Sequence, residues 1–509
     1  MCAIVGLIKR KKGRKGRSIT VRLVKSLKRL KNRGSLSAGI TVEAKDGYFI
    51  GHRNLGAPKI VFNQFPYGEF EALMGVGQNR YATAGDNSPA ALLRCIQPLG
   101  VDVYELVQNG NILNVDEVRH FLQEQGKVFN SESDGEVMLR LFLFYLEKEA
   151  PQESRNDRDY ARKVFAAIKK ANRHLNGGWS VIIMSPRGLI VWRDPHGLRP
   201  VCLGRRFDEV GKLMEISVVS ESSALNQFGD YHLRGEEIRP GEVLFITRRL
   251  TIHRKRLSHC REAFCFFEFA YFALSDSCFK DRYVEVVRKK WGEILGQETV
   301  DLCGKVDVVI GIPGSAVSAG IALARVWNVP YEQAIIKTDS TRSFQETSDE
   351  KRLQAIDDKF IFIRHWIEGK RVAIVDDSNV RGNTSKKIIE RLFRLGAKTV
   401  DVLYYTPPII GSCFYGIDTP QAEKLIANRC HCDLVKIAEE LAELCPEHRG
   451  DITVRYISLA GLLAGMDLPA NQLCLACVTG EYPTICGKKK TAEVIAAQGQ
   501  RREKERAAG

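Results

Sequence analysis

The sequence predicts two domains of different class: a sheet-rich first half, then an α/β second half with a mainly parallel sheet. In the first half, short alternating apolar runs are separated by Gly and Asn turns, as in WSVIIMSPRGLIVWRDPHGLRPVCLG at 179–204. From about residue 280 helices and strands alternate. VDVVIGI, RVAIVDD and TVDVLYY are β-branched runs without period-two alternation, which is typical of parallel strands buried on both faces.

The length of 509 residues allows two substantial cores. We expect a first domain at 2–250, a second at 251–487 and a charged, disordered tail at 488–509. The content of 44% hydrophobic and 27% charged residues is that of a soluble globular protein. No apolar run approaches the roughly 20 residues that span a bilayer, and the N-terminus lacks the order of a secretory signal. The expectation is a cytoplasmic protein with no membrane partner.

The segment from Lys9 to Arg33 contains thirteen Lys or Arg and no Asp or Glu. Within it, apolar residues at helical spacing predict an amphipathic helix with one basic face; they are Ile19, Leu23, Leu27 and Leu30. One interpretation is a site for nucleic acid or an anionic membrane. We favour the other, a surface helix packed on a core, because a charge run alone is weak evidence. Nucleic acid is therefore not an expected partner.

The chain begins Met-Cys, and removal of Met1 would give Cys2 a free α-amine next to its thiol. With a pKa of about 7.7–8.0, such an amine can take the thiol proton, so one residue supplies both nucleophile and base. The alternative for Cys2 alone is a thiol buried in a strand. Four further stretches weigh against that alternative: NRGSLSAGI (32–40), NRYATAGDN (79–87), VQNGNILN (107–114) and SESDGEV (131–137).

Together with Cys2, these stretches resemble the N-terminal-nucleophile glutamine amidotransferase domain. The resemblance implies an α+β domain of the αββα sandwich type. It also implies that Asn109 and Gly110 donate hydrogen bonds to the oxyanion, that Arg80 holds the glutamine carboxylate and that Asp134 holds its ammonium. The chain departs from the family pattern at Ala3, where Gly is usual, and at Gln78, where His is favoured.

A second signature is VAIVDDSNVRGNTSK at 372–386, which reads as strand, loop and helix start. Backbone N–H groups at the helix start, with nearby hydroxyls, make a cradle for a phosphate dianion. Two carboxylates at the carboxyl end of the strand would face a ribose diol and Mg²⁺. The segment resembles the phosphoribosyl diphosphate (PRPP) signature of type I phosphoribosyltransferases. The expected PRPP-binding residues here are Asp376, Asp377, Ser378, Gly382, Thr384 and Ser385.

Two neighbouring loops differ from that family. The pyrophosphate loop reads GIPGSAVS, with Gly314 in place of an acid and Ser315 kept as an Mg²⁺ ligand beside Asp376 and Asp377. The catalytic loop reads KTDSTRSF at 337–344 and is short of one Arg, while Lys337 and Arg342 stay available for phosphate contacts. These changes leave open a diverged paralogue with an impaired transferase site, acting as a glutaminase or as a regulatory or nucleic-acid-associated protein.

The order of the two signatures resembles the amidophosphoribosyltransferase family, over roughly residues 2–487. That resemblance implies a working enzyme that makes 5-phosphoribosylamine from glutamine and PRPP, the first step of de novo purine synthesis. It further implies ammonia passed internally between the sites, a homo-oligomer (tetramer or dimer) and feedback inhibition by purine nucleotides.

Fourteen cysteines in an intracellular chain indicate metal sooner than disulfides. The sharpest feature is the chelate spacing of Cys474 and Cys477. Some members of the family carry a [4Fe–4S] cluster on this pair and two earlier cysteines, which Cys265 and Cys413 match. Zinc on the same pair, with Cys430, His431 or Cys432, and four unmetallated thiols are the alternatives.

Overall fold

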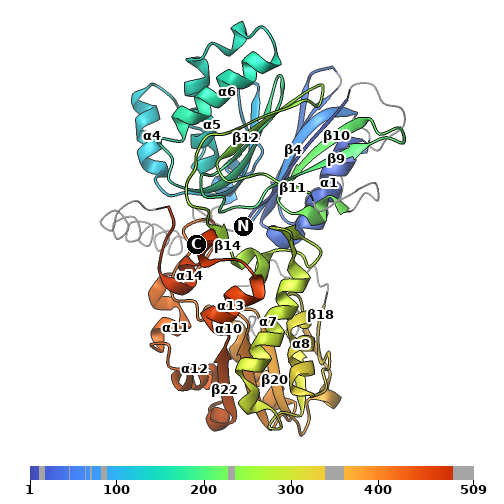
Figure 1. Cartoon of the computed structure of the whole chain (residues 1–509), viewed down its shortest axis with the longest axis vertical. Helices are drawn as coiled ribbons and strands as arrows, with labels where there is room; N and C mark the ends of the chain where they lie inside the picture. The colour runs from blue at the N-terminus through green and yellow to red at the C-terminus, as the bar shows by residue number, and fades with distance from the viewer. Residues whose placement is uncertain are drawn as a thin grey trace.

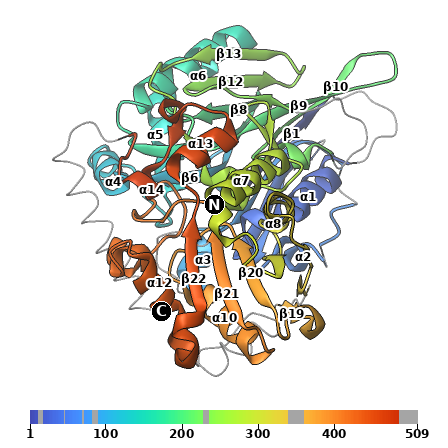
Figure 2. The ribbon, with the colours of Figure 1, turned by 60° about the horizontal axis from the view of Figure 1, so that its bottom comes forward.

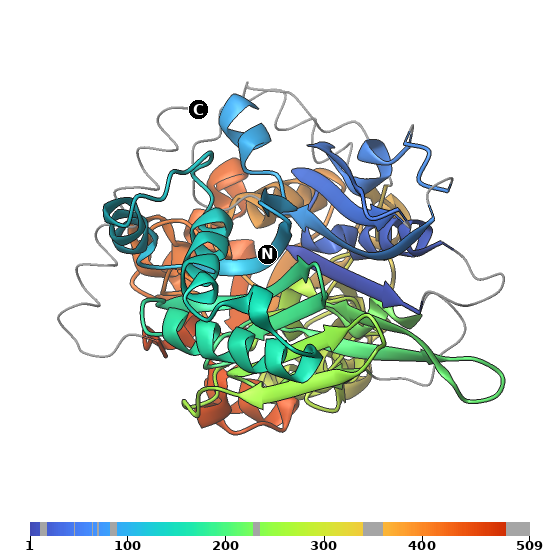
Figure 3. The same ribbon diagram turned by 90° about the horizontal axis from the view of Figure 1, so that it is seen from above.

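The chain forms two bodies stacked end to end (Figure 1). This computed structural model describes residues 1–10, 18–44, 46–63, 65–68, 71–81, 89–226, 235–338 and 360–484. The first body holds the blue-to-green half of the chain and the second the yellow-to-red half. The N-terminus lies at the junction between them (Figure 1), and seen from above it lies near the middle of the molecule (Figure 3).

Two antiparallel sheets form the first body. The order of the seven-stranded sheet is β11 (Glu236–Glu237), β9 (Cys202–Phe207), β10 (Leu213–Val219), β1 (Ala3–Lys9), β4 (Ala72–Arg80), β2 (Ser37–Ala44) and β3 (Phe49–Leu55). The order of the six-stranded sheet is β13 (Ile252–Arg256), β12 (Glu242–Thr247), β8 (Gly188–Arg193), β7 (Gly177–Ser185), β6 (Tyr104–Ile112) and β5 (Leu99–Val101).

The sheets pack face to face, and helices cover their outer faces. Alternation along β1 shows this, because Ile4 and Ile8 share a core with Ile182 of the other sheet, while Ala3 and Val5 face helix α1 (Ile19–Arg29). The six-stranded sheet is covered by α4 (Val115–Glu124), α5 (Asp134–Glu147) and α6 (Asp157–Ala171). The predicted αββα sandwich is confirmed.

The amphipathic helix of the basic segment is α1, and it packs on the seven-stranded sheet. Ile19, Leu23 and Leu27 are fully buried against that sheet. On the same helix, Arg22 is buried in an ion pair with Glu215 of β10, with 2.9 Å between Nη1 and Oε1. The favoured interpretation of a helix packed on a core is confirmed for α1, whereas residues 11–17 of the basic segment lie outside the described residues.

The second body is built on a parallel sheet, ordered β17 (Val308–Gly311), β20 (Arg371–Asp376), β21 (Thr399–Tyr404) and β22 (Ile452–Tyr456). Figure 2 shows β20, β21 and β22 side by side. In β20, Val372 to Val375 are at most 1% exposed, as expected for a strand covered on both faces. The longer helices are α7 (Val284–Glu298), α8 (Val317–Trp327), α10 (Asn383–Arg394), α12 (Leu434–Leu441) and α13 (Leu459–Met466).

Short elements complete the described part of the chain. The two-stranded pairs are β14 (Phe264–Cys265) with β23 (Leu473–Cys474), β15 (Cys278–Phe279) with β16 (Arg282–Tyr283), and β18 (Ile335–Lys337) with β19 (Phe360–Phe362). The short helices are α2 (Pro58–Val61), α3 (Pro89–Arg94), α11 (Ile426–Arg429) and α14 (Ala476–Thr479). Among all the residues that the structure describes, no helix is long and apolar enough to cross a membrane.

The expected domain boundary between residues 250 and 251 stays a prediction. The last strand of the six-stranded sheet, β13, ends at Arg256 and pairs with β12. We therefore propose a boundary directly after Arg256, so that the whole sheet belongs to the first domain. The expected tail at 488–509 lies outside the described residues.

Candidate active sites

Cys2 lies directly before β1, in the interior of the molecule. It is 6% exposed, and its backbone N–H donates to Oδ1 of Asn109 over 3.1 Å. The carbonyl of Cys2 accepts a hydrogen bond from Nε of Arg33 at 3.1 Å. Both sides of the Cys2 backbone are therefore fixed by buried side chains, which limits the positions that its thiol can reach.

Asn109 holds an unused donor beside Cys2. Its side chain is fully buried, yet Nδ2 has no hydrogen-bond partner within the described residues. A buried donor without a partner costs about 1–3 kcal/mol, a cost that is recovered when a ligand accepts the bond. This orphaned amide is what an oxyanion site needs before its substrate arrives.

The direction of the Gly110 N–H follows from the geometry of strand β6, which places it on the edge that faces away from β7. Gln108 directs both of its backbone groups away from β7, its N–H to Gln97 Oε1 at 2.6 Å and its carbonyl to Gln78 Nε2 at 2.6 Å. Alternate residues of a strand repeat this orientation, so Gly110, two residues on, presents its N–H there too. Only glycine fits at 110, because a Cβ would lie 2.0 Å from the carbonyl oxygen of Gly178, at a φ of +138°.

Asp134 and Arg80 lie close to this edge. Asp134 opens α5, whose N-cap Ser133 accepts a hydrogen bond from Gly135 at 3.2 Å. The Asp134 carboxylate accepts hydrogen bonds from Gln108 Nε2 at 2.9 Å and Ile112 N–H at 3.2 Å. Burial raises its pKa, and the Arg80 guanidinium acts in the opposite direction.

The two departures from the family pattern have structural explanations. Ala3 lies in β1, outside the residues with positive φ, so its methyl group is compatible with the strand. Gln78 donates to the Gln108 carbonyl and thereby supports the strand that carries Asn109. Neither substitution displaces a group of this centre.

A buried ionic network lies behind Cys2 and includes Arg33, which bonds the Cys2 carbonyl; no sequence pattern predicts it. Arg33 Nη1 lies 2.7 Å from Glu221 and 2.9 Å from Glu268, and all three side chains are fully buried. The fourth member is Arg199, 3.6 Å from Glu268 and equally buried. The nearby carboxylates raise the Arg33 pKa against the opposing effect of burial, so the guanidinium stays charged.

Met1 is also buried, at 1% exposed. Its sulfur lies 2.6 Å from Nη1 of Arg199, and its side chain belongs to the core of the second body. Burial lowers the pKa of its α-amine to about 5. With Met1 present, the nitrogen of Cys2 is an amide that cannot accept a proton, so the free α-amine expected at Cys2 depends on removal of Met1.

The strand–loop–helix predicted at 372–386 is present, as β20 followed by α10. Gly382 is the N-cap of α10, with φ +87° and Ile426 2.9 Å from where a Cβ would be. Ser385 lies in the first turn of α10 and accepts a hydrogen bond from Tyr404 at 2.9 Å. Thr384 is its exposed neighbour in that turn. These residues lie together at the N-terminus of α10, where the phosphate cradle is expected, and phosphate binding there stays a prediction.

The two carboxylates lie where β20 ends, beside the pyrophosphate loop. Ser315 donates to Asp377 Oδ2 at 2.5 Å, and Ser378 donates to Oδ1 at 2.6 Å. The Asp377 N–H donates to Asp376 Oδ1 at 2.8 Å. Burial raises the pKa of Asp377. Ser315, Asp376 and Asp377 are oxygen donors of the kind that Mg²⁺ prefers, so the donor set fits the expected ion.

The structure describes only part of the altered loops. Gly314 has φ +117°, a conformation that an aspartate adopts only with strain, so the loop backbone suits glycine. Lys337 ends β18 as an exposed residue. Arg342 lies outside the described residues, so its expected phosphate contact stays a prediction.

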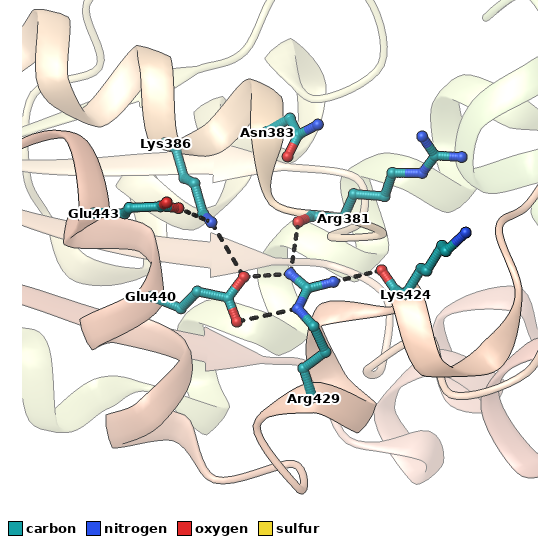
Figure 4. A pocket seen from close by; sticks show the side chains of 7 residues that line it. All are labelled: Arg381, Asn383, Lys386, Lys424, Arg429, Glu440 and Glu443. Atoms are coloured by element: carbon teal, nitrogen blue, oxygen red, sulfur yellow. Dashed lines mark hydrogen bonds and ion pairs between the residues drawn. The ribbon is translucent and has the colours of Figure 1, made fainter.

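A charged pocket of about 500 Å³ flanks the cradle (Figure 4). Arg429 links its walls, since it donates to the Arg381 carbonyl at 3.1 Å and pairs with Glu440. Lys386 of α10 pairs with the same Glu440 at 3.1 Å. These contacts restrain the loop at Arg381 and the start of α10. They join residues far apart in the sequence, so no sequence pattern predicts them.

Segment 268–272 lies between the two centres. Phe272 packs edge-on against Tyr81, next to Arg80, with ring centroids 6.0 Å apart. Burial raises the pKa of Tyr271, and so do the nearby charges of Asp377 and Asp376. One short segment therefore contacts Tyr81 next to Arg80 and lies near enough to the carboxylate pair for its charges to act on Tyr271.

The four matched cysteines come together at the junction. Cys265 and Cys474 pair across β14 and β23, and Arg199 lies 3.9 Å from the sulfur of Cys413. Burial raises the thiol pKa of Cys265 to about 11, and the nearby Cys413 adds to this shift. Burial also raises the thiol pKa of Cys477, and the nearby Cys265, Cys474 and Cys413 raise it further. In the described part of the chain, no three His, Cys, Asp or Glu are spaced to hold a single metal ion.

Comparisons with known proteins agree with this two-part fold. A family model described as a glutamine amidotransferase domain matches residues 94–227. The amidophosphoribosyltransferase of Bacillus subtilis is 34% identical over 467 residues, covering 89% of each chain. The Arabidopsis thaliana chloroplastic amidophosphoribosyltransferase 2 is 33% identical over 464 residues, covering 90% of this chain and 76% of the relative.

A solved structure extends the likeness to three dimensions. The glutamine PRPP amidotransferase from B. subtilis, complexed with ADP and GMP, superposes with a TM-score of 0.78 at 31% identity, covering 96% of this chain and 98% of that one. Fold and sites thus define an N-terminal-nucleophile glutamine amidotransferase joined to a phosphoribosyltransferase. The chain belongs to the amidophosphoribosyltransferase family.

Proposed function

We propose that this chain makes 5-phosphoribosylamine, glutamate and pyrophosphate from glutamine, PRPP and water, the first step of de novo purine synthesis. The observation that carries the proposal is the pairing of two centres in one chain. The orphaned Asn109 amide lies beside Cys2, and the carboxylates of Asp376 and Asp377 lie at the end of β20, ahead of the N-terminus of α10. The likeness over about nine-tenths of the chain favours a working enzyme over a decayed paralogue.

In the glutamine half, the Cys2 thiol loses its proton to the α-amine exposed by Met1 removal and attacks the carboxamide carbon. The oxyanion that forms accepts hydrogen bonds from Asn109 Nδ2 and the Gly110 N–H. The amine then protonates the leaving ammonia, and water hydrolyses the thioester to glutamate. Arg80 binds the substrate carboxylate and Asp134 its ammonium.

In the transferase half, ammonia forms a bond to the anomeric carbon of PRPP as the bond to pyrophosphate breaks. The cradle at Gly382, Thr384 and Ser385 binds a phosphate, with Lys337 near the leaving group. Mg²⁺ held by Ser315, Asp376 and Asp377 would neutralise charge on the diphosphate. Internal transfer past segment 268–272 keeps ammonia unprotonated, because ammonium has no lone pair for attack.

The direct test is one mass-spectrometric assay of glutamine, PRPP and Mg²⁺, which scores glutamate and pyrophosphate separately. We expect both products in equal amounts. Glutamate without pyrophosphate would instead support the impaired paralogue, whose transferase site has lost its function.

Asp376→Asn combined with Asp377→Asn should weaken PRPP binding at least about 100-fold, because two charged contacts are lost at once. Basal glutaminase activity should persist, since neither residue contacts the Cys2 centre. Titration with PRPP in the presence of Mg²⁺ measures the loss. Asp301→Asn is the control, as it changes an exposed carboxylate that pairs with Arg455. Unchanged PRPP affinity in the double variant would mean that the pair is structural.

The raised pKa of Asp134 predicts a pH dependence of glutamine use. As the pH falls through this raised pKa, the carboxyl becomes neutral and stops attracting the substrate ammonium, so kcat/KM for glutamine falls. The fall should begin above the ordinary aspartate value of about 3.9. Asp134→Asn should lower kcat/KM by about 10- to 100-fold at neutral pH. The ratio of kcat/KM in the parent to kcat/KM in Asp134→Asn, measured across pH, separates the titration of Asp134 from that of the Cys2 amine, which both proteins share. A ratio that does not change with pH would contradict the proposed role of Asp134.

For the cysteines, we propose a structural [4Fe–4S] cluster on Cys265, Cys413, Cys474 and Cys477. Three buried thiols, the partly buried Cys477 and the neighbouring Arg199 suit it, since iron would supply the positive charge that lets such thiols ionise. Cys430 is engaged elsewhere, as its thiol donates to Glu440 at 3.2 Å, which weakens the zinc alternative. Anaerobically purified protein should contain four iron and four acid-labile sulfide per chain, whereas zinc without sulfide would refute the cluster.

We further propose a cytoplasmic homo-oligomer, a tetramer or dimer, that purine nucleotides inhibit. The support for inhibition is the B. subtilis relative, whose solved structure is described as a complex with ADP and GMP. Initial-rate measurements with ADP and GMP, and sedimentation of the purified protein, test these proposals.

A further inference from the structure

One edge of β6, beside the proposed oxyanion donors Asn109 and Gly110, has no strand next to it in the part of the chain that the structure describes. Strand β5 pairs with β6 only from Tyr104 to Leu106. Beyond that point, among the described strands, β6 has a neighbour on one side only, namely β7. The second half of the chain covers the open edge instead, with residues 410–420, here called the 410–420 loop.

The loop contacts the strand at two neighbouring residues. Asn111 Nδ2 donates to the Phe414 carbonyl at 2.8 Å. Gly416, at φ +109°, packs directly on Gly110, since a Cβ at 416 would lie 3.2 Å from the Gly110 carbonyl carbon and 3.3 Å from its oxygen. Backbone therefore packs on backbone, and the loop restrains the Cα and carbonyl of Gly110, the residue whose N–H is proposed to bind the oxyanion.

The loop is held firmly enough to act as a support. The N–H groups of Ile410 and Gly411 both donate to the Cys477 carbonyl, at 2.8 and 3.0 Å. At its base, Ser412 Oγ donates to the Pro420 carbonyl at 2.7 Å. Phe414 and Tyr415 are 3% and 1% exposed. The loop therefore connects the segment of the paired cysteines to the oxyanion strand.

We infer that Asn111 and Gly416 are positioning residues for glutamine hydrolysis, which hold the Gly110 N–H where the oxyanion forms. The inference rests on the proposed roles of Cys2, Asn109 and Gly110. An oxyanion donor is effective only when fixed in advance, and a misplacement of about 1 Å can slow a reaction about 100-fold. A loop of the second domain thus helps to fix the position of an oxyanion donor in the first domain.

Two variants test this inference, with one matched control. Gly416→Ala forces the loop away from Gly110, and Asn111→Asp removes the donor and turns a carboxylate toward the Phe414 carbonyl. We expect kcat for glutamine hydrolysis to fall about 10- to 100-fold, with KM for glutamine and ammonia-dependent synthesis close to parent values. Gly304→Ala is the control, since Gly304 has φ +77° and nothing within 4 Å of a built Cβ.

A binding measurement separates positioning from folding. An aldehyde analogue of glutamine forms a tetrahedral adduct with Cys2 that needs the oxyanion donors, whereas alkylation of Cys2 by iodoacetamide does not. Both variants should bind the aldehyde about 10- to 100-fold more weakly and react with iodoacetamide at the parent rate.

Three outcomes would overturn the inference. The first is that the variants match Gly304→Ala in kcat and aldehyde affinity. The second is that ammonia-dependent synthesis falls as much as glutamine hydrolysis, which would assign the loop to folding alone. The third is a parent protein that neither hydrolyses glutamine nor binds the aldehyde at Cys2; then the proposed roles of Cys2, Asn109 and Gly110 are themselves wrong.

Discussion

Cys2→Ala is expected to abolish glutamine-dependent synthesis while ammonia-dependent synthesis continues. Removing a nucleophile from a site whose other parts stay in place typically costs about 10⁴- to 10⁶-fold in kcat. The transferase half needs only ammonia and PRPP, and Cys2 lies in the other half, hydrogen-bonded to Asn109. Parallel assays with glutamine and with ammonium salts at alkaline pH measure the two activities.

The matched control is Cys303→Ala, which removes an exposed thiol far along the chain. It should leave both activities at parent values. Residual glutaminase activity in the Cys2 variant would refute the nucleophile assignment, and loss of the ammonia-dependent activity would show that the substitution disturbed the second half.

Glu268→Gln should destabilise the folded chain by about 3–5 kcal/mol, because it leaves buried positive charge without compensation. Glu268 lies between Arg33 and Arg199, and all three side chains are fully buried. Neither guanidinium can lose its proton to relieve the imbalance, since arginine stays charged in proteins. The shift in the urea midpoint of unfolding measures the loss.

The exposed pair of Arg29 and Asp276 gives the control. Their side chains are 43% and 39% exposed, and such surface pairs contribute at most about 1 kcal/mol. Asp276→Asn should therefore shift the urea midpoint little. If Glu268→Gln is no more destabilising than this control, the network does not hold the two halves together.

Much of the fold was predictable, because its signals are local. The uninterrupted β-branched run ending at Asp376 indicated a strand buried on both faces, and the spacing of Ile19, Leu23 and Leu27 indicated the packed face of α1. Asn109, Gly110 and Asp134 were found through short stretches whose order along the chain carries information. Their assigned roles stay predictions until the variants are measured.

The ionic network was not predictable in this way. Arg33 meets Glu221 and Glu268 across 188 and 235 positions, and an ion pair between distant residues leaves no periodic pattern. The available signal was Glu268 itself, a lone carboxylate in the aromatic run CFFEFAYF, since a buried charge needs a partner. Nothing in the sequence named that partner. Likewise, Gly416 reads as a turn glycine until its contact with Gly110 is seen.

Buried Met1 has a consequence for the order of events during synthesis. A methionine that is 1% exposed and enclosed between the two halves is out of reach of an aminopeptidase once those halves have closed. The proposed free amine of Cys2 therefore requires that Met1 be cleaved before Arg33 meets Glu268 and the two halves close. For the same reason an affinity tag belongs at the C-terminus, because any extension ahead of Cys2 would have to be accommodated in the packed junction.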